Sequence, residues 1–597
     1  MMDNIVEGGE FLARPVAAEE IFAPEEFSKE HKAIARTVKE FVAGEIQSRG
    51  DEIEHVDNDL SRALMEKAGE VGLLAADLPE EYDGMALDKI SSLIISDFFG
   101  QGAGSFAITE LNHTGIGTLP LAFFGTEAQK QKYLPGLSSG QLIGAFGLTE
   151  PDAGSDALNA KTTAVLSDDG THYVINGSKC FITNAGFGDL IFTFAKVDGK
   201  AFTAFIVGFG TEGVSTDAEE AKMGMKGTST RSINFNNVRV PVENVLGEVG
   251  RGHVVALNAL NMGRFKVGAV CVGDARGVFG EAVKYARQRH QFNQPICEFG
   301  LIKEKIGDMA VRLFAAESMM YRTAGMLDKK IKDSGDVTAA DIGRVTAGAM
   351  EEYLIECSIM KIYGSETQGF VADESVQIFG GYGYIYENPA EIAYRNARIN
   401  RIWEGTNEIN RTTIAGTLLK RHAKERLTLE IDPAAIFQEI QGLEAISTEA
   451  PDTLAAQKTM LAVGKMVSRY VIGIVNDRLN GNLNSHQEVA GIISDMVIQI
   501  FATESALLRA EKLMNSKNRR NADVAIQMVQ VLSLQFYDHL RSLTSRILPA
   551  MMQDAEWLEK RSQLGRVLSS PPIDTIALTR QIADQCIKKN GVPIKIA

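Results

Sequence analysis

The spacing of hydrophobic residues changes twice along this chain of 597 residues, and that change limits its possible folds more than any other feature. Between about residues 26 and 145 apolar side chains recur every three or four positions, which predicts several helices divided at Pro79, Pro120 and Pro135. Residues 146–250 contain short β-branched and aromatic runs separated by turn sequences such as SDDG and VDGK, which predict a compact, largely antiparallel β domain. Helical spacing returns in residues 251–422 and predicts a helical bundle.

A second helical block follows the linker LTLEIDP and occupies residues 428–597. Its most regular apolar stripe runs from Met460 to Ile474, and we expect this stripe to pack on a neighbouring domain instead of a membrane. The predicted fold is therefore mainly α with a middle β domain. Its segments are an N-terminal extension (1–25), an N-terminal helical domain (26–145), a middle β domain (146–250), a helical bundle (251–422) and a C-terminal helical extension (428–597).

Composition excludes several classes of function. No apolar run approaches the roughly 20 residues that span a bilayer, so membrane association is expected to be peripheral at most. A net charge of −16 without a sustained Lys/Arg run argues against nucleic-acid binding. The first twenty residues resemble neither a signal nor a transit peptide, so we expect a cytoplasmic protein. Five cysteines without a CxxC pair argue against a disulfide framework or a thiolate metal site, and no metal is expected.

Three motifs fit catalytic or metal-binding patterns, but their surroundings favour structural roles. GLSSG at residues 136–140 fits the GxSxG pattern of hydrolases, yet a polar helical stretch precedes it where a nucleophile elbow needs a strand. ExxH pairs at residues 52–55 and 110–113 have the spacing of di-iron ligands, but surface or satisfied histidines are favoured. GGYG at residues 380–383 lacks the GxGxxG spacing of a dinucleotide fold and is interpreted as a turn between helices.

A stronger signal stands where the helical region gives way to the β domain. The segment FGLTEPDAGSD, residues 146–156, places Thr149, Gly154 and Ser155 where amides and hydroxyls can approach an anionic or heteroaromatic ligand. KCFITN follows about thirty residues later and puts Phe181 and Thr183 on the same side of a strand. An aromatic plane beside a hydroxyl is suited to a flavin ring.

These segments, together with RQRHQFNQPI, QIFGGYGYIYE and RIWEGTNEI in this order, resemble the acyl-CoA dehydrogenase family across about residues 28–420. NALNMGRF, NVLGEVGRGH and the helical extension make the chain most similar to the very-long-chain branch of that family. The resemblance implies N-terminal helices, a middle β domain, a four-helix bundle and an extra helical domain, with FAD bound between two subunits. It also implies fatty acyl-CoA as substrate, in fatty-acid β-oxidation.

The resemblance assigns roles to residues by motif position. The positions that would contact the flavin and its ribityl chain are Phe146, Leu148, Thr149, Gly154, Ser155, Phe181 and Thr183. The positions that would meet the pyrophosphate and adenosine of the partner subunit's FAD are Arg289, Phe292, Gln377 and Gly381, with Thr406 and Glu408 completing the site. The positions that would line the thioester or CoA channel are Ser155, Asn261, Arg264, Trp403 and Gly405.

Glu404, in WEGTNEI, is where the family's usual catalytic base is found. It would remove the α-proton of the acyl thioester while the flavin N5 accepts the β-hydride, giving a trans-2-enoyl-CoA. Burial should raise the pKa of Glu404, because desolvation disfavours a charged carboxylate. Some relatives carry the base on the helix matching residues 261–264, but no acid is present there.

The resemblance further implies an electron-transfer flavoprotein as electron acceptor, a homodimer, and medium to very long acyl chains. Pocket depth depends on how residues 105–113 pack, which the sequence does not fix. An acyl-CoA oxidase is the nearest alternative, and an assembly or scaffold protein that retains the dehydrogenase fold is an alternative from another class. The chain departs from the family pattern at Phe181, where tryptophan is usual, at Asn293, where glycine is usual, and at Ile392 and Asn396, where charges are common.

Overall fold

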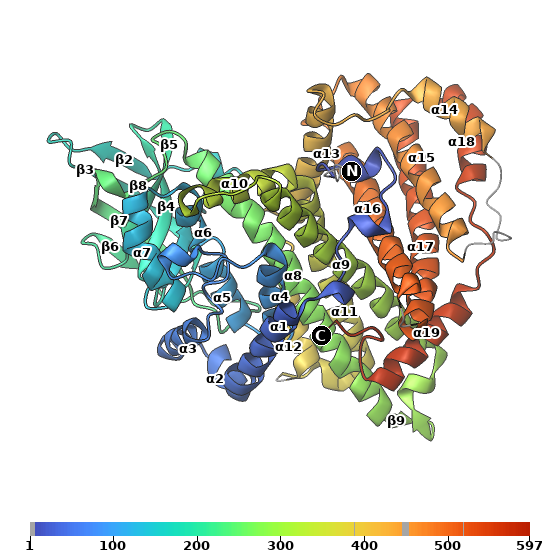
Figure 1. Ribbon diagram of the computed structural model, residues 1–597, viewed down its shortest axis with the longest axis horizontal. Coiled ribbons are helices and arrows are strands. Elements are labelled where there is room, and N and C mark those ends of the chain that lie inside the picture. Colours follow the sequence, from blue (N-terminus) through green and yellow to red (C-terminus); the bar gives the residue numbers. More distant parts are fainter. Residues whose placement is uncertain (1–5, 387, 444–452, 517–518, 597) are drawn as a thin grey trace.

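The computed structural model describes residues 6–386, 388–443, 453–516 and 519–596. A β domain lies at one end, helices fill the middle, and the C-terminal extension lies at the other end (Figure 1). One continuous hydrophobic core runs from the N-terminal helices through the bundle into the extension, while the sheet has a second core of its own. The predicted class, mainly α with a middle β domain, is confirmed.

The N-terminal domain is a set of short helices whose starts are fixed by polar caps. Ser28, Asp57, Asp88 and Thr126 each accept a hydrogen bond from the backbone N–H three residues later, as N-cap residues do. The main helices are α1 (Lys29–Phe41), α2 (Gly50–Glu54), α3 (Asn58–Glu70), α4 (Lys89–Gly100), α5 (Phe106–Thr114), α6 (Leu119–Phe124) and α7 (Glu127–Ser139). Every residue of α4 and α5 is buried, which places them at the centre of the domain.

Two sequence interpretations of this region are settled by α7. Pro135 lies inside α7, so it does not divide two helices as predicted from the sequence. The GLSSG segment forms the last turn of the same helix, and Gly140 ends it in the left-handed conformation, with φ of 76°. Since a helix and not a strand precedes Ser138, the hydrolase geometry is absent from this segment.

The middle domain is an eight-stranded sheet: seven strands follow the order β6-β7-β3-β2-β4-β5-β8, and the eighth, β1, pairs with β4. Pairing is antiparallel except for the contacts of β4 with β1 and β2, so the prediction of a largely antiparallel domain holds. The strands are β1 (Gly144–Gly147), β2 (Thr163–Leu166), β3 (His172–Thr183), β4 (Leu190–Val197), β5 (Ala201–Gly208), β6 (Val214–Thr216), β7 (Thr230–Pro241) and β8 (Val245–Leu246).

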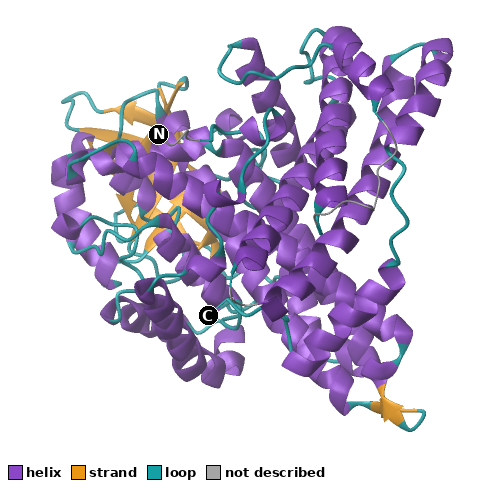
Figure 2. Ribbon diagram, turned by 45° about the vertical axis from the view of Figure 1, so that its right-hand side comes forward, coloured by secondary structure: helices purple, strands orange, loops and turns teal. Residues whose placement is uncertain are grey.

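Long helices form the bundle that holds the candidate site. They are α8 (Gly252–Gln288), α9 (Gly300–Lys332), α10 (Ala339–Glu352), α11 (Leu354–Phe379), α12 (Pro389–Ile399) and α13 (Asn407–Ala423). A hairpin of β9 (His290–Gln291) and β10 (Gln294–Pro295) projects from the end of α8 (Figure 2). α8 and α11 run close together, because a Cβ on Gly268 would meet the backbone of Met360 at 3.1 Å.

The extension contributes α14 (Pro433–Gly442), α15 (Ala455–Leu479), α16 (Gln487–Asn515), α17 (Arg519–Met551), α18 (Asp554–Val567) and α19 (Thr575–Lys589). The stripe that begins at Met460 is buried, but α15 packs mainly on α14, α16 and α17 of the same extension and not on a neighbouring domain. By length and composition, α16 is the one described helix apolar enough to cross a membrane. Its most apolar window is 83% buried, because α16 packs against α9, α13, α15 and α17.

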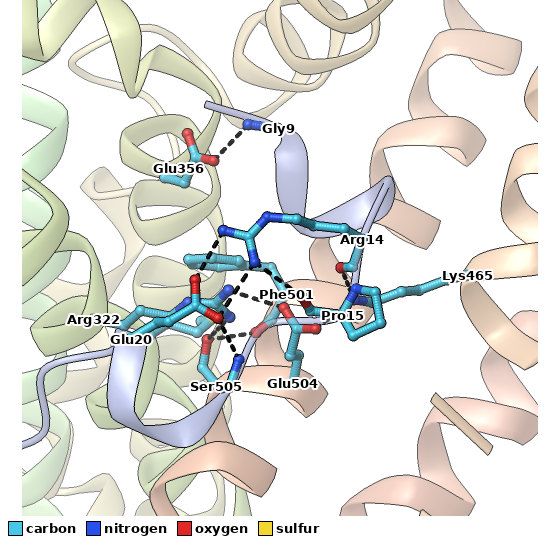
Figure 3. A network of polar contacts seen from close by, with 12 residues as sticks. Gly9, Arg14, Pro15, Glu20, Arg322, Glu356, Lys465, Phe501, Glu504 and Ser505 are labelled. Atoms are coloured by element: carbon cyan, nitrogen blue, oxygen red, sulfur yellow. Dashed lines mark hydrogen bonds and ion pairs between the residues drawn. The ribbon is translucent and has the colours of Figure 1, made fainter. Parts of the chain in front are cut away.

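The segment of residues 6–27, called here the N-terminal strap, lies between the bundle and the extension (Figure 1). Its Phe11 and Leu12 are fully enclosed in the core. The Gly9 N–H donates to Glu356 of α11 at 2.8 Å, and Lys465 of α15 donates to the Arg14 carbonyl at 3.1 Å (Figure 3). The strap therefore touches both bodies.

Beneath the strap, a buried ionic cluster joins α9 to α16. Arg322 donates to Glu504 at 2.9 Å and to Ser505 at 3.0 Å, and its guanidinium lies 4.6 Å from the Phe501 ring centroid (Figure 3). Lys465 pairs with the other carboxylate oxygen of Glu504. Because the Arg322 and Glu504 side chains are 1% and 2% exposed, each charge depends on its partners for the solvation that water cannot supply.

Glu504→Gln should therefore destabilise the protein strongly, because it leaves two buried cations without their counter-ion. We expect the free energy of unfolding to fall by about 3–5 kcal/mol, the usual result of breaking a buried pair. Urea denaturation followed by circular dichroism measures this change. The matched control is Glu511→Gln on the same helix, whose partner Lys458 has a side chain 43% exposed. That variant should cost less than about 1 kcal/mol. Equal losses would show that the buried cluster does not fasten the extension.

Candidate active site

The segment between α12 and α13, called here the 403–406 loop, holds its backbone in a conformation that side chains rarely adopt. Glu404 has a φ of 53° and Gly405 a φ of 79°. The Asn410 amide donates to the carbonyls of Gly405 at 2.8 Å and Thr406 at 3.1 Å. Thr406 then caps α13 by accepting the Ile409 N–H at 3.2 Å. The loop is thus fixed by the helix that follows it.

The Glu404 side chain points at the backbone of α8. A Cβ on Gly263 would lie 2.3 Å from Glu404 Oε2, so only glycine leaves room for the carboxyl group at this distance. That oxygen is inaccessible to solvent and has no hydrogen-bond partner among the described residues. Desolvation raises the pKa of Glu404 to about 7, while the nearby charges of Arg264 and Lys361 limit the rise. The predicted direction of this shift is confirmed.

A second polar group in the loop is also unpartnered. The indole Nε1 of Trp403 is inaccessible to solvent and finds no acceptor within the described chain. Buried donors and acceptors are nearly always satisfied, so orphaned groups on two consecutive residues point to a bound ligand. The backbone N–H of Glu404 makes no hydrogen bond to any described residue and is also available.

Two cations support the loop from beneath. Arg264, buried on α8, donates to Asn261 at 2.9 Å and contacts the Glu404 carbonyl at 3.4 Å. Lys361 of α11 donates to the Gly405 carbonyl and to Asn407 Oδ1, both at 2.8 Å. Burial lowers the pKa of Lys361 to about 8. The structure therefore brings Asn261 and Arg264, which were predicted as substrate contacts, together with Glu404 and Gly405.

The predicted flavin contacts of the β domain form a second group. Phe146 and Leu148 are buried, and Phe146 packs on Phe194 with ring centroids 5.3 Å apart. The two motifs are joined, because Cys180 N–H donates to the Thr149 carbonyl at 3.0 Å. A buried ion pair between Lys179 and Glu150, at 2.7 Å, fixes the same junction.

Phe181 is presented outward at this junction. It is 65% exposed, and the register of β3 against β7 shifts between Lys179 and Ile182. Ile182 faces the core, which leaves Phe181 and the half-buried Thr183 away from it. Gly154 and Ser155 are also exposed, and the Gly154 Cβ position is open. An exposed aromatic ring beside open backbone fits a planar ligand lying on the sheet.

The predicted pyrophosphate and adenosine contacts lie elsewhere. Figure 1 places the β9–β10 hairpin at the opposite end of the molecule from the β domain. Phe292 at its tip is 88% exposed, and Arg289 at its base lies over Tyr382, 5.9 Å from the ring centroid. Gln377, Gly381 and Glu408 are exposed, and Thr406 is half-buried. One chain therefore does not bring the hairpin residues Arg289 and Phe292 to its own β domain.

The departures from the family pattern have local explanations at two positions. Phe292 and Asn293 have φ of 49° and 64°, and asparagine tolerates this region better than most residues, so it replaces glycine in the turn. Asn396 is buried and accepts the Met225 N–H at 2.5 Å, tying α12 to the β domain. Nothing in the structure explains Ile392.

The ExxH pairs are structural. His55 is exposed, and its Nδ1 contacts the Asp51 carbonyl. His113 is buried between the Leu137 carbonyl at 2.8 Å and the Gly144 N–H at 3.1 Å, so both ring nitrogens are occupied. Among residues 6–386, 388–443, 453–516 and 519–596, no group of three His, Cys, Asp or Glu side chains could hold a metal ion.

Sequence reasoning missed Gly263, Lys361 and Asn410. Lys361 carried a signal, because a lysine within the apolar run IECSIMKIYG needs a buried acceptor. Gly263 carried none, since a glycine inside a helix is common and its partner is distant in the sequence.

Comparisons with known proteins agree with this geometry. Family models described as the acyl-CoA dehydrogenase N-terminal, middle and C-terminal domains match residues 28–141, 145–238 and 250–419. A further model, also described as an acyl-CoA dehydrogenase C-terminal domain, matches residues 463–564 within the extension.

Individual relatives extend the match over the whole chain. A Bacillus subtilis protein named "Probable acyl-CoA dehydrogenase" is 42% identical over 584 residues, 97% of each chain. The mitochondrial very long-chain specific acyl-CoA dehydrogenase of Rattus norvegicus is 37% identical over 62% of this chain and 54% of its own. A crystal structure of an acyl-CoA dehydrogenase complexed with FAD from Bacillus anthracis superposes with a TM-score of 0.96, at 40% identity, over 99% of this chain and 100% of that one. The chain belongs to the acyl-CoA dehydrogenase family.

The Gly263 contact generates a prediction about the pH dependence of stability. Because the folded pKa of Glu404 lies above its ordinary value of 4.5, the folded state binds the proton more tightly between pH 4.5 and 7. The stabilisation of the folded state by protonated Glu404 is fully present below pH 4.5 and is lost as the pH rises through about 7. Over this range wild type should lose up to about 3 kcal/mol more unfolding free energy than Glu404→Gln.

Gly263→Ala should remove most of that difference, because the new methyl group pushes the carboxyl toward solvent. Urea titrations at several pH values measure it. Gly280→Ala on the same helix is the control, since its Cβ would meet nothing within 4 Å. If Gly263→Ala retained the wild-type pH dependence, contact with α8 would not be the cause of the shift.

Proposed function

We propose that the chain catalyses the FAD-dependent α,β-dehydrogenation of fatty acyl-CoA to trans-2-enoyl-CoA, with Glu404 as the base. The observation that carries the proposal is the half-buried Glu404 carboxyl, whose Oε2 is enclosed and unpartnered and whose pKa is raised to about 7. A general base works best when its pKa is near the working pH, because the group is then both available and basic. The notch at Gly263 holds this carboxyl against α8.

The 403–406 loop and the two cations beside it would support proton removal in other ways. The α-proton of a thioester is weakly acidic, so its removal needs stabilisation of the negative charge that develops on the carbonyl oxygen. The free N–H of Glu404 can donate to that oxygen. Arg264 and Lys361 hold the loop backbone, which keeps base and donor in a fixed relation. When bound, FAD supplies the acceptor for the hydride that leaves the β-carbon.

The cofactor site requires two copies of the chain in this proposal. Phe181 and the 146–156 segment would hold the flavin end of one FAD, and Arg289, Phe292, Gln377 and Gly381 of the partner subunit its adenosine end. The support is that Figure 1 places the β9–β10 hairpin, which carries Phe292 at its tip and Arg289 at its base, away from the β domain of the same chain. We propose a homodimer, in which the extension covers surfaces that shorter family members use to form tetramers.

The acceptor of the electrons is proposed to be an electron-transfer flavoprotein. An acyl-CoA oxidase is the alternative, and reduction without oxygen followed by timed exposure to air separates the two, since an oxidase reoxidises rapidly. The other alternative is an assembly or scaffold protein that retains the dehydrogenase fold without the activity. Turnover of purified acyl-CoA by the purified protein would exclude it. These reactions belong to fatty-acid β-oxidation.

Glu404→Gln should keep the fold, FAD and acyl-CoA binding, yet slow flavin reduction at least about 10²-fold, because the amide cannot accept the proton. Stopped-flow bleaching of the flavin under anaerobic conditions measures the rate. Gly280→Ala serves as the control and should reduce at the wild-type rate. Bleaching of Glu404→Gln at the wild-type rate would require another residue to take the proton.

Arg289→Ala should weaken retention of FAD more than it weakens folding. Arg289 is exposed in one chain and lies beside Tyr382, where the partner's cofactor would reach. The ratio of flavin to protein after gel filtration, compared with the unfolding midpoint, measures both effects. Light scattering of wild type should give the mass of two chains, and a mass near four chains would contradict the dimer.

Long acyl chains should be better substrates than short ones. The support is the similarity to the rat very long-chain enzyme, together with the burial of all residues from 105 to 113. A panel of acyl-CoA substrates from four carbons upward, read by bleaching of the flavin, gives the preference. Highest activity with butyryl-CoA would overturn this proposal.

A further inference from the structure

The C-terminal extension contacts α13, the helix that directly follows the 403–406 loop. α13 begins at Asn407, directly after its N-cap Thr406, the last residue of that loop, and it packs against α16 of the extension. Two side chains of α16 face it there. Asp495 Oδ1 accepts from Arg411 Nε at 2.7 Å, and Ser494 Oγ donates to the Arg411 backbone carbonyl at 2.6 Å. The extension therefore holds Arg411 by both its side chain and its backbone.

Arg411 also binds a carboxylate of α11, so it links that helix to the extension. Its Nη1 pairs with Glu366 Oε1 at 2.9 Å, and its Nη2 donates to Glu366 Oε2 at 3.2 Å. The guanidinium thus spans two carboxylates, one from each body, and its planar fork fixes their relative orientation. The Arg411, Asp495 and Glu366 side chains are 20%, 28% and 38% exposed, so solvent weakens but does not remove the pairing.

From Glu366 the contacts lead into the loop. Asn407 Nδ2 donates to Glu366 Oε1 and to Ser365 Oγ, each at 3.1 Å. The Oδ1 of the same amide accepts from Lys361, which also holds the Gly405 carbonyl. Asn407 and Lys361 are fully enclosed, and an enclosed amide with all its partners fixed has one available orientation.

We propose that Asp495 is a positioning residue for the reaction, and that the extension sets the geometry of the 403–406 loop through the path Asp495, Arg411, Glu366, Asn407 and Lys361. The inference rests on the proposed function of Glu404. The extension would then do more than cover a surface, because it would orient the backbone that carries the base. The buried Arg322–Glu504 cluster fastens the same helix α16 at a different place, so attachment and positioning can be tested separately.

Asp495→Ala tests the proposal with Glu511→Gln as its matched control. Glu511 pairs with Lys458 of α15 at 2.5 Å. Glu511→Gln therefore also removes an ion pair of α16, but that pair does not involve α13. At saturating acyl-CoA, Asp495→Ala should slow flavin reduction about three- to tenfold, the scale of coupling through a network. The Kd for acyl-CoA should stay within about twofold, and Glu511→Gln should match wild type. Asp495→Glu, which can still reach Arg411, should restore most of the rate.

A double-mutant cycle locates the path. If Asp495 acts through Asn407, the rate loss of Asp495→Ala combined with Asn407→Ala should be smaller than the product of the two separate losses. Multiplicative losses would overturn the path. Equal rates for Asp495→Ala and Glu511→Gln, or a loss of rate explained by lost FAD, would overturn the positioning role itself.

Hydrogen–deuterium exchange gives a readout that needs no substrate. Amides of residues 403–410 should exchange faster in Asp495→Ala than in wild type, and at the wild-type rate in Glu511→Gln. Unchanged exchange would contradict the proposal. The proposed function fails separately, if acyl-CoA does not bleach the flavin of the wild type or if Glu404→Gln keeps the wild-type rate.

Discussion

A half-buried carboxyl group, with one oxygen enclosed against a helix backbone and without a hydrogen-bond partner, is the constraint on which the rest of the site depends. Desolvation raises the pKa of Glu404 to about 7. The pKa stays raised only while the loop and its neighbours keep water away from the carboxyl group. Gly263 provides the space, and Asn410 with Lys361 holds the loop. The bundle is built so that three helices meet at one strained residue.

The two cations beside the 403–406 loop hold its backbone in place and do not form an ion pair with Glu404. Arg264 and Lys361 donate to backbone carbonyls and to asparagine side chains, not to the Glu404 carboxylate. A direct ion pair would have favoured the ionised form and lowered the pKa of the base. Because the two cations contact backbone carbonyls instead, they fix the loop without lowering the pKa of Glu404 as far as a direct ion pair would.

Much of the fold could be predicted from the sequence, because periodicity is a local property. The change from helical to strand spacing near residue 146 and back near residue 251 was visible, and the ordered motifs singled out Glu404 as the candidate base. Pro135 was misjudged, since its place inside α7 depends on packing that local propensity does not contain. The stripe of α15 was assigned to the wrong partner, because periodicity shows that a face is buried but not against what. Contacts such as Arg264 with Glu404, 140 residues apart, have no local signature.

The N-terminal strap also constrains the order in which the chain can finish folding. Glu25 pairs with Arg509 of α16, 484 residues later in the chain. At about 5–20 residues per second, a ribosome needs about 25–100 seconds to make the intervening polypeptide. During that time Phe11 and Leu12 have no permanent place to be buried. These apolar residues, made long before α16, are thus among the last to be enclosed, and they stay open to contact until α16 has been made.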